Sequence, residues 1–443
     1  MSKTRLQEKL LRAYRKNCGR VLTSQDTHYE TSLSNWHEVP NPNNTGPQPI
    51  VVIPQNLSQL KLILQRAYRE GAQVATSSGA PCLERPVDVL IDLSAFNEAG
   101  FDSHATTMRA GAGAYWPEVI EDLEYRGILK LGLAGLWTNE SIARHALHGG
   151  LNWFARSHGL TSQHVQRIQG VTAVGDIVEA TPDHNPYLFD ALCGGADCIA
   201  VTHVTQTLFP LPRQLYGGQL VFQRWDAPLV VEHYNQWVRQ LPGSVTVGLR
   251  LKADGVVLTF CSSDISAGEQ VVSFWRSMVG RVATTYTALS PRAILELSRP
   301  LATTAAPSRF EGGMLLTSIP PVVEKFVEGL LPEYFAESWC IGGAYAAGQH
   351  ASNSLRHLES ARHILLLGGE TKTFEAARAN APRTALLRER LWTTAMIHSG
   401  IFPGLAFSNF STPEYVYMDQ ATRIEEVKER WDPTGMFVNN VKW

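Results

Sequence analysis

The sequence has 443 residues, 44% of them hydrophobic and 18% charged, which suits two globular domains with sizeable cores. Lys plus Arg number 39 and Asp plus Glu number 41. This balance excludes the basic footprint of a nucleic-acid-binding protein, and no basic run indicates a membrane surface.

The first twenty residues predict an amphipathic helix, with Leu6, Leu10, Leu11 and Tyr14 along one face. They lack the uninterrupted apolar stretch of a secretory signal. No run of the chain approaches the roughly 20 apolar residues that span a bilayer. We therefore expect a cytosolic protein with neither a nucleic-acid partner nor a membrane partner.

The six cysteines are scattered, and no pair has the spacing of a zinc site. A reducing compartment argues against disulfides. We expect most of them to be small buried side chains.

Residues 49–94 predict a βαβ-like unit. A short apolar strand (49–54) precedes a helix of regular apolar period (57–71) that ends at Gly71. Strands at 72–78 and 87–94 follow, joined by the loop SSGAPCLERP (77–86).

The next stretch predicts a strand at 108–114 and a helix at 116–127, with Pro117 in its first turn. Residues 138–159 fit one helix broken near Gly149 and Gly150, and 165–181 fit a hairpin. A short helix (185–195) and a long strand (196–212) lead to a Pro-rich boundary.

Beyond residue 217 the pattern changes to strand, helix and a hairpin whose turn is KADG (252–255). A strand-like run (338–348), a helix (384–397) and a last helix stopped by Asp432-Pro433 complete the chain. The class is α+β. We predict one domain over 1–212, a second over 213–403, and a segment (404–443) that returns to the first.

Six segments carry a family resemblance: 19–36, 51–79, 108–127, 159–181, 339–348 and 427–440. In order and spacing they resemble the vanillyl-alcohol-oxidase superfamily, specifically its berberine-bridge-enzyme-like branch. The resemblance covers nearly the whole chain. It implies an FAD-binding domain of the PCMH type and a substrate domain formed by an antiparallel sheet backed by helices. Because a fold does not determine a function, the site residues are considered separately.

The first flavin-contacting loop of the family has the approximate pattern R-S-G-G-H, in which the His is a covalent anchor. The matching residues here are Ser77, Ser78, Gly79, Ala80 and Pro81. Pro has no nucleophilic nitrogen and no backbone donor, so flavin cannot attach at this position. The resemblance implies that this loop and the adjacent Cys82 still contact the cofactor. An ordinary strand-to-loop turn, with Cys82 as a loop thiol, is the alternative.

A second stretch (135–145) matches the loop that carries a Cys anchor in bicovalent members, and here Trp137 takes that position. Ala143 and Arg144 replace paired glycines, and His145 alone matches. Arg144 either pairs with phosphate or fills the space of a flavin. The cofactor contacts that the resemblance implies outside the first loop are Trp137, Ser141, Ala143, Arg144, His145, Ile199 and Asn439.

The family's Y-V-N motif appears as Phe407-Ser408-Asn409, so its Tyr cannot act as a base here. The candidates are His145, whose residue type titrates near neutrality, and Tyr345, with Asn409 orienting a carbonyl or hydroxyl. The alternative is that His145 only hydrogen-bonds inside the first domain. His145 and His148 lie three residues apart without a carboxylate partner, which favours structural histidines over a metal site.

The resemblance implies an oxidoreductase that binds FAD non-covalently and takes hydride from a small organic, natural-product-type substrate, with dioxygen as acceptor. Two alternatives stay open. One is a redox-neutral cyclase or lyase with a structural or lost flavin. The other is a non-catalytic binding protein. The sequence does not determine the oligomeric state.

Overall fold

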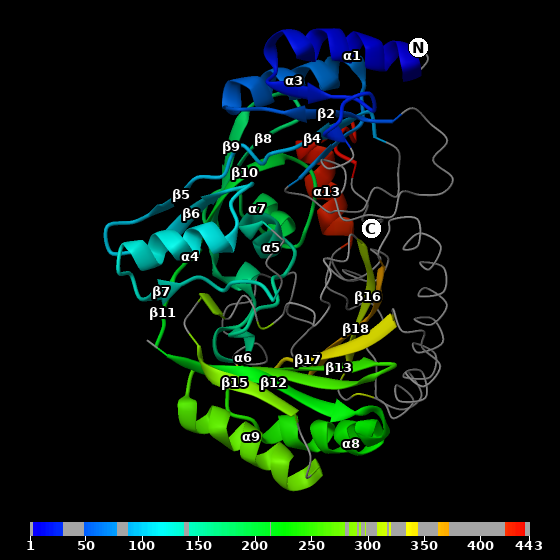
Figure 1. Ribbon diagram of the computed structural model, residues 1–443. Coiled ribbons are helices and arrows are strands. Elements are labelled where there is room, and N and C mark those ends of the chain that lie inside the picture. The colour runs from blue at the N-terminus through cyan, green and yellow to red at the C-terminus, as the bar shows by residue number, and fades with distance from the viewer. Residues whose placement is uncertain are drawn as a thin grey trace.

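The computed structural model describes residues 3–29, 48–77, 87–136, 141–212, 214–279, 283–289, 292–293, 297, 308–316, 319, 334–343, 362–371 and 421–438. Figure 1 shows two sheets and their helices in the upper part of the molecule and one large sheet in the lower part. The α+β class predicted from the sequence is confirmed.

A four-stranded sheet lies beneath the N-terminal helices α1 (Lys3–Asn17) and α3 (Leu57–Glu70). Its strands are β1 (Arg20–Leu22), β2 (Ile50–Ile53), β3 (Val74–Thr76) and β4 (Val89–Ile91). Helix α3 begins at Asn56, which caps the backbone N–H of Gln59, and ends at Gly71, whose φ of 65° suits glycine. The βαβ unit is confirmed, but β4 lies between β2 and β3 and is parallel to both.

A five-stranded antiparallel sheet has the order β5-β6-β10-β8-β9. Its strands are β5 (Ala99–Phe101), β6 (Thr107–Gly111), β8 (Val165–Val171), β9 (Ile177–Ala180) and β10 (Ala200–Thr207). Helices α4 (Trp116–Tyr125), α5 (Ile142–Leu147) and α7 (Pro186–Cys193) share one apolar core with it. The hairpin over 165–181 is confirmed.

Two predictions in this region need correction. The long strand over 196–212 is shorter, because β10 ends at Thr207 and β11 (Phe209–Pro210) pairs instead with β7 (Lys130–Leu131). The stretch 138–159 contains two short helices, α5 and α6 (Ala155–His158), rather than one broken helix of that length. Gly149 and Gly150, both with positive φ, separate them as expected.

The lower sheet has seven antiparallel strands in the order β15-β12-β14-β13-β17-β18-β16. They are β12 (Leu215–Gln223), β13 (Val245–Lys252), β14 (Gly255–Ser262), β15 (Ala283–Leu289), β16 (Ser308–Leu316), β17 (Tyr334–Cys340) and β18 (His363–Thr371). Helices α8 (Ala227–Trp237) and α9 (Ile265–Val279) cover one face, and the other face points toward the upper sheets (Figure 1).

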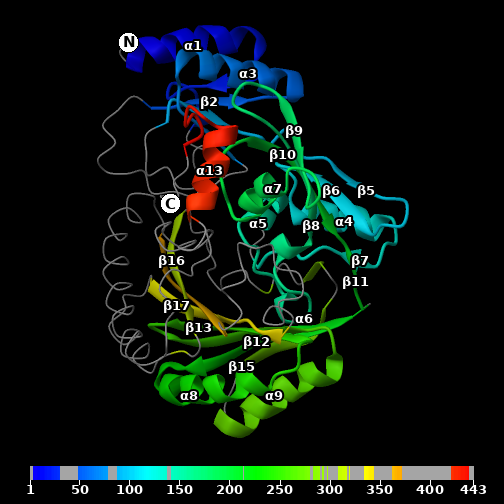
Figure 2. The same cartoon turned by 180° about the vertical axis from the view of Figure 1, so that it is seen from behind.

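The last described helix, α13 (Ala421–Trp431), lies beside the upper sheets in both views (Figures 1 and 2). Helix α7 is among its neighbours. The turn after it brings Phe437 alongside Val74 of β3 as a parallel bridge. This arrangement is compatible with a C-terminal segment that returns to the first domain. The boundaries at 212 and 403 stay predictions.

In the described part of the chain, five cysteines are buried and free of disulfides: Cys18, Cys193, Cys198, Cys261 and Cys340. Burial raises the pKa of all five thiols. Within the described ranges, no helix combines the length and apolar composition needed to cross a bilayer.

Candidate functional site

His145 lies in α5 under the loop that precedes this helix. Its side chain is 2% exposed. A Cβ placed on Gly135 would lie 2.8 Å from the imidazole ring, so the loop passes over the ring at a distance that only glycine allows. Ser141 caps α5 by accepting the backbone N–H of Arg144 at 3.3 Å. The helix and the loop together fix the position of the ring.

The Thr161 hydroxyl joins His145 to the turn at 149–161. Its oxygen lies 2.8 Å from the Leu133 carbonyl oxygen and 3.1 Å from that of Gly150. It also lies 3.1 Å from His145 Nε2 and 3.4 Å from Asn152 Nδ2. Because the single hydroxyl proton serves a carbonyl, the imidazole donates, which favours the Nε2-protonated tautomer of His145.

Trp153 and Trp339 form the aromatic contact between the first domain and the large sheet. Their ring centroids lie 5.1 Å apart and their planes are at 86°, an edge-to-face pair. The Trp339 ring lies against Gly248 of the neighbouring strand β13, where a Cβ would come within 2.7 Å of it. Both indoles are buried. We call this contact, together with the residues of α6, the domain seam.

Two residues before Trp339, the same strand carries Glu337, which is 3% exposed. Arg250 Nε and Nη2 donate to Glu337 Oε2 at 2.6 and 2.5 Å, and Trp339 Nε1 donates to Oε1 at 2.6 Å. The Arg250 guanidinium also lies 4.7 Å from the ring centroid of Phe335. Three donors on one carboxylate suit its ionised form.

Strand alternation directs this ion pair toward the first domain. Ala336 and Cys340 of β17 belong to the core under α8 and α9, so Phe335, Glu337 and Trp339 occupy the opposite face. Glu337 and Arg250 are not among the site residues predicted from the sequence. The predicted strand-like run begins at residue 338, whereas β17 spans Tyr334–Cys340. An alternation extended to Phe335 would have included Glu337.

Several predicted cofactor residues lie in described positions. Ser77 follows β3, where its backbone N–H donates to the Ile91 carbonyl and its Oγ accepts from Leu93 N at 2.8 Å. Ala143 is buried and Arg144 half-buried on α5. Ile199 is buried directly before β10. The structure brings Ser141, Ala143, Arg144 and His145 together on one helix turn.

The remaining predicted site residues lie outside the described ranges: Ser78, Gly79, Ala80, Pro81, Cys82, Trp137, Tyr345, Asn409 and Asn439. His148 Nδ1 lies 2.9 Å from the carbonyl oxygen of Arg144 in the preceding helix turn. Across the described part of the chain, no three His, Cys, Asp or Glu side chains converge as metal ligands.

Two buried polar atoms near His145 and the domain seam provide a test of whether a flavin fits. Trp153 Nε1 and Ser162 Oγ have no hydrogen-bond partner among the described residues. Trp153 packs on Trp339, and Ser162 N donates to the Gly149 carbonyl beside the His145–Thr161 contact. Buried polar atoms normally find partners. A flat ring system with donors and acceptors on its edges, such as a flavin, suits this environment.

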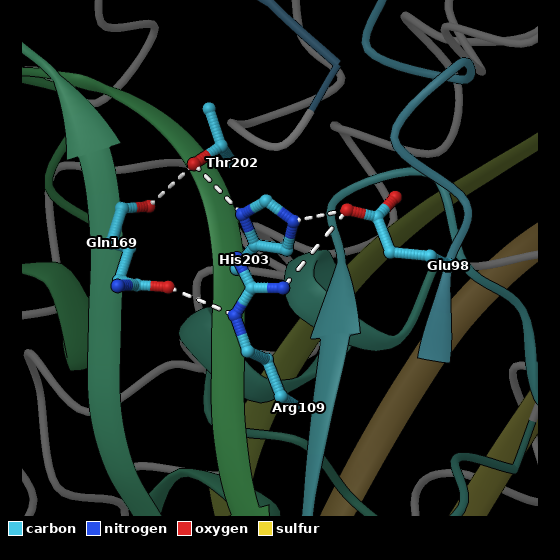
Figure 3. A network of polar contacts seen from close by, with 5 residues as sticks. All are labelled: Glu98, Arg109, Gln169, Thr202 and His203. Atoms are coloured by element: carbon cyan, nitrogen blue, oxygen red, sulfur yellow. Dashed lines mark hydrogen bonds and ion pairs between the residues drawn. The ribbon is translucent and has the colours of Figure 1, made fainter. Parts of the chain in front are cut away.

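A second polar cluster crosses the five-stranded sheet (Figure 3). His203 Nε2 lies 2.6 Å from Glu98 Oε1, and Arg109 Nε donates to Gln169 Oε1 at 2.9 Å. Thr202 lies at the irregularity in the β10–β8 register, and its hydroxyl donates to the Gln169 carbonyl oxygen. Burial lowers the pKa of His203, and the Glu98 contact opposes this. Arg109 and Glu98 are exposed, and these contacts join the members of the cluster to one another. We therefore interpret the cluster as structural.

Residues 48–181 match the family model described as an FAD binding domain. The chain is 31% identical over 135 residues to the bifunctional solanapyrone synthase of Alternaria solani. It is 29% identical over 145 residues to the (R)-6-hydroxynicotine oxidase of Paenarthrobacter nicotinovorans. These matches cover 30% and 32% of this chain, but only 25% and 30% of the two relatives.

Solved structures match over almost the full length. BBE-like 1 of Physcomitrella patens superposes with a TM-score of 0.83 at 16% identity, covering 98% of this chain and 99% of that protein. A berberine bridge enzyme variant described as a reticuline dehydrogenase gives 0.82 at 15% identity, covering 97% and 98%. The chain therefore has the fold of the berberine-bridge-enzyme-like proteins, and its residues 48–181 match an FAD binding domain.

Proposed function

We propose that this protein is an FAD-dependent oxidoreductase of the oxidase type, which binds its flavin non-covalently and oxidises a small organic substrate. The match of residues 48–181 to the FAD binding domain carries the proposal. Pro81 and Trp137 occupy the positions that the resemblance assigns to covalent anchors. The (R)-6-hydroxynicotine oxidase relative supports oxidation of a small molecule, although it matches over only part of its length.

The proposed cofactor site uses the first-domain residues around α5. Ser77, Ser141, Arg144 and the backbone at 133–136 would hold the cofactor, with the ring system near the domain seam. When bound, FAD would accept a hydride from the substrate and return the electrons to dioxygen. The protein supplies binding, orientation and exclusion of water.

The face of β13 and β17 that points toward the first domain is the proposed substrate wall. Glu337 and Arg250 form a fixed pair of charges there, and the buried rings of Phe335 and Trp339 lie beside them. Such a wall suits a flat organic molecule with one or two polar groups. We retain His145 as the candidate base, although its described contacts, to Thr161 and beneath Gly135, are to first-domain residues. Tyr345 and Asn409 keep their predicted roles.

The state of the flavin tests this proposal directly. The purified protein, supplied with FAD if necessary, is expected to show flavin absorption bands in the visible region. Acid precipitation should release all of the colour into the supernatant, because neither Pro81 nor Trp137 can form a flavin linkage. Colour that remains with the precipitated chain would contradict non-covalent binding. A protein that neither carries nor takes up FAD would favour the redox-neutral or binding-protein alternatives.

A small-molecule substrate and dioxygen are the only partners in this proposal. Three further expectations stay predictions from the sequence. They are that the substrate is of the natural-product type, that the protein is cytosolic, and that it has no nucleic-acid or membrane partner.

A further inference from the structure

Arg156 extends from the first domain into the second. It lies in the short helix α6 and is 7% exposed. Its Nη2 donates to the Leu241 carbonyl at 2.7 Å, and its Nη1 donates to Cys340 Sγ at 3.1 Å and to the Ile341 carbonyl at 3.5 Å. All three acceptors follow elements of the large-sheet domain or end one of its strands. Among the described residues, no carboxylate pairs with this guanidinium.

The backbone of the second domain also lies close to Arg156. Gly343 has a φ of +62°, and a Cβ there would lie 2.2 Å from the Arg156 carbonyl oxygen. A Cβ on Gly243 would lie 3.3 Å from the same oxygen. Contacts this close are possible only in one relative position of α6 and these two turns. Figures 1 and 2 both show α6 directly against the large sheet.

Two of the three acceptors of Arg156, Cys340 and Ile341, lie at the end of β17, the strand that carries Glu337. Cys340 and Ile341 come immediately after Trp339, which donates to Glu337. Trp153, three residues before Arg156, packs on the same Trp339. A displacement at Arg156 is therefore transmitted to Trp339 and Glu337 through adjacent residues of one strand.

We infer that Arg156 is a positioning residue: it fixes how the large sheet lies on the first domain, and so where Glu337 and Trp339 stand relative to the cofactor. This inference rests on the proposed flavin function. The planar guanidinium suits the role because it holds several acceptors at fixed angles. A lysine ammonium carries the charge without that geometry.

The buried thiol of Cys340 provides a local probe. The proteins compared are the full-length wild type, Arg156→Gln and Arg156→Lys. The control is Arg126→Gln, an exposed arginine that pairs with Asp122 and lies over the Phe101 ring, away from the domain seam. Each is labelled with N-ethylmaleimide, and the rate is followed at each cysteine by mass spectrometry. Visible circular dichroism of added FAD reports the surroundings of the flavin.

We expect Cys340 to be labelled about tenfold faster or more in Arg156→Gln, because local opening controls the labelling of a buried thiol. Cys193 and Cys198, buried in the first-domain core, should keep their wild-type rates. The visible circular dichroism should change while FAD still binds. Arg156→Lys should show the same changes to a smaller extent, and Arg126→Gln should show none.

Wild-type labelling of Cys340 in both Arg156 variants would overturn the inference. Faster labelling of Cys340 with an unchanged flavin spectrum would also overturn it, because the strand would then move without affecting the site. If Arg156→Gln unfolds globally, all the cysteines become reactive and Arg156→Lys decides by the same criteria. Failure of the proposed function is seen separately, as a wild-type protein that binds no FAD.

Discussion

The carboxylate of Glu337 fixes the positions of two neighbouring side chains, Arg250 and Trp339. It receives two hydrogen bonds from Arg250 and one from Trp339, and all three residues belong to the paired strands β13 and β17. Arg250 and Glu337 are direct cross-strand partners, as are Gly248 and Trp339. The missing side chain at Gly248 leaves room for the indole, whose N–H then reaches the carboxylate. The geometry of the proposed substrate wall thus depends on a glycine as much as on the charges.

Glu337→Gln keeps the shape of the side chain but leaves the half-buried Arg250 charge without the Glu337 carboxylate. We expect the free energy of unfolding to fall by about 3 kcal/mol, measured by chemical denaturation. Arg250→Met in the Glu337→Gln background should recover part of the loss, because the unpaired charge is then gone. Strictly additive losses in this cycle would show that the two residues do not interact.

The turn after α13 joins the C-terminal segment to strand β3. Asp432 Oδ1 accepts from Met436 N at 2.9 Å and Oδ2 accepts from Phe437 N at 2.7 Å. The turn then brackets Val74 of β3, with Val74 N donating to the Met436 carbonyl and Val438 N to the Val74 carbonyl. A residue near the C-terminus thereby supports the strand that leads into Ser77.

Replacement of Asp432 by Asn should weaken this turn. An amide offers one acceptor oxygen in place of two, and its NH2 group would face a backbone N–H. We expect a loss of about 1–3 kcal/mol in unfolding free energy and faster proteolysis after α13. Thr434→Ala is the matched control, because the Thr434 hydroxyl is 3.4 Å from Asp432 Oδ1 and contributes little. Equal effects of the two variants would argue against the carboxylate as the anchor.

Elements formed by local sequence could be predicted, whereas pairings between distant segments could not. Helix α3 follows from its apolar period, its Asn56 cap and Gly71, all within one segment. The insertion of β4 between β2 and β3, and the bridge from Phe437 to Val74, depend on residues far apart in the sequence. The same limit applies to the candidate site. His145 was found by a local motif, but the contact of Arg156 with Cys340 follows only from the packing of two domains.

Across the whole molecule, three arginines of distant segments, Arg156, Arg239 and Arg362, act on one buried histidine, His363. His363, at the start of β18, is fully buried beside Ser338 and Tyr234. Burial, reinforced by the positive charges of Arg156, Arg239 and Arg362, lowers its pKa to about 3. The imidazole is therefore neutral in the folded protein at any pH at which the unfolded chain begins to protonate it, near 6.5.

Protonation of His363 in the unfolded chain destabilises the native protein in acid. Between pH 6.5 and about 3 the unfolded state binds a proton at His363 that the native state does not, so acidification favours unfolding. This one group makes the unfolding free energy fall by up to about 1.4 kcal/mol per pH unit below 6.5, and it contributes nothing above that pH. His158 and His203, whose pKa values burial also lowers, act in the same direction.

His363→Gln isolates the contribution of this group. Urea denaturation of wild type and variant at pH 7.5, 6.5, 6 and 5 should give a roughly constant stability difference between pH 7.5 and 6.5. The difference should then narrow as the wild type loses stability faster on acidification. The variant retains His158 and His203, so their effects cancel in the comparison. Parallel stability curves down to pH 5 would mean that His363 is protonated equally in both states, and hence that the native protein admits a positive charge on His363 beside Arg156.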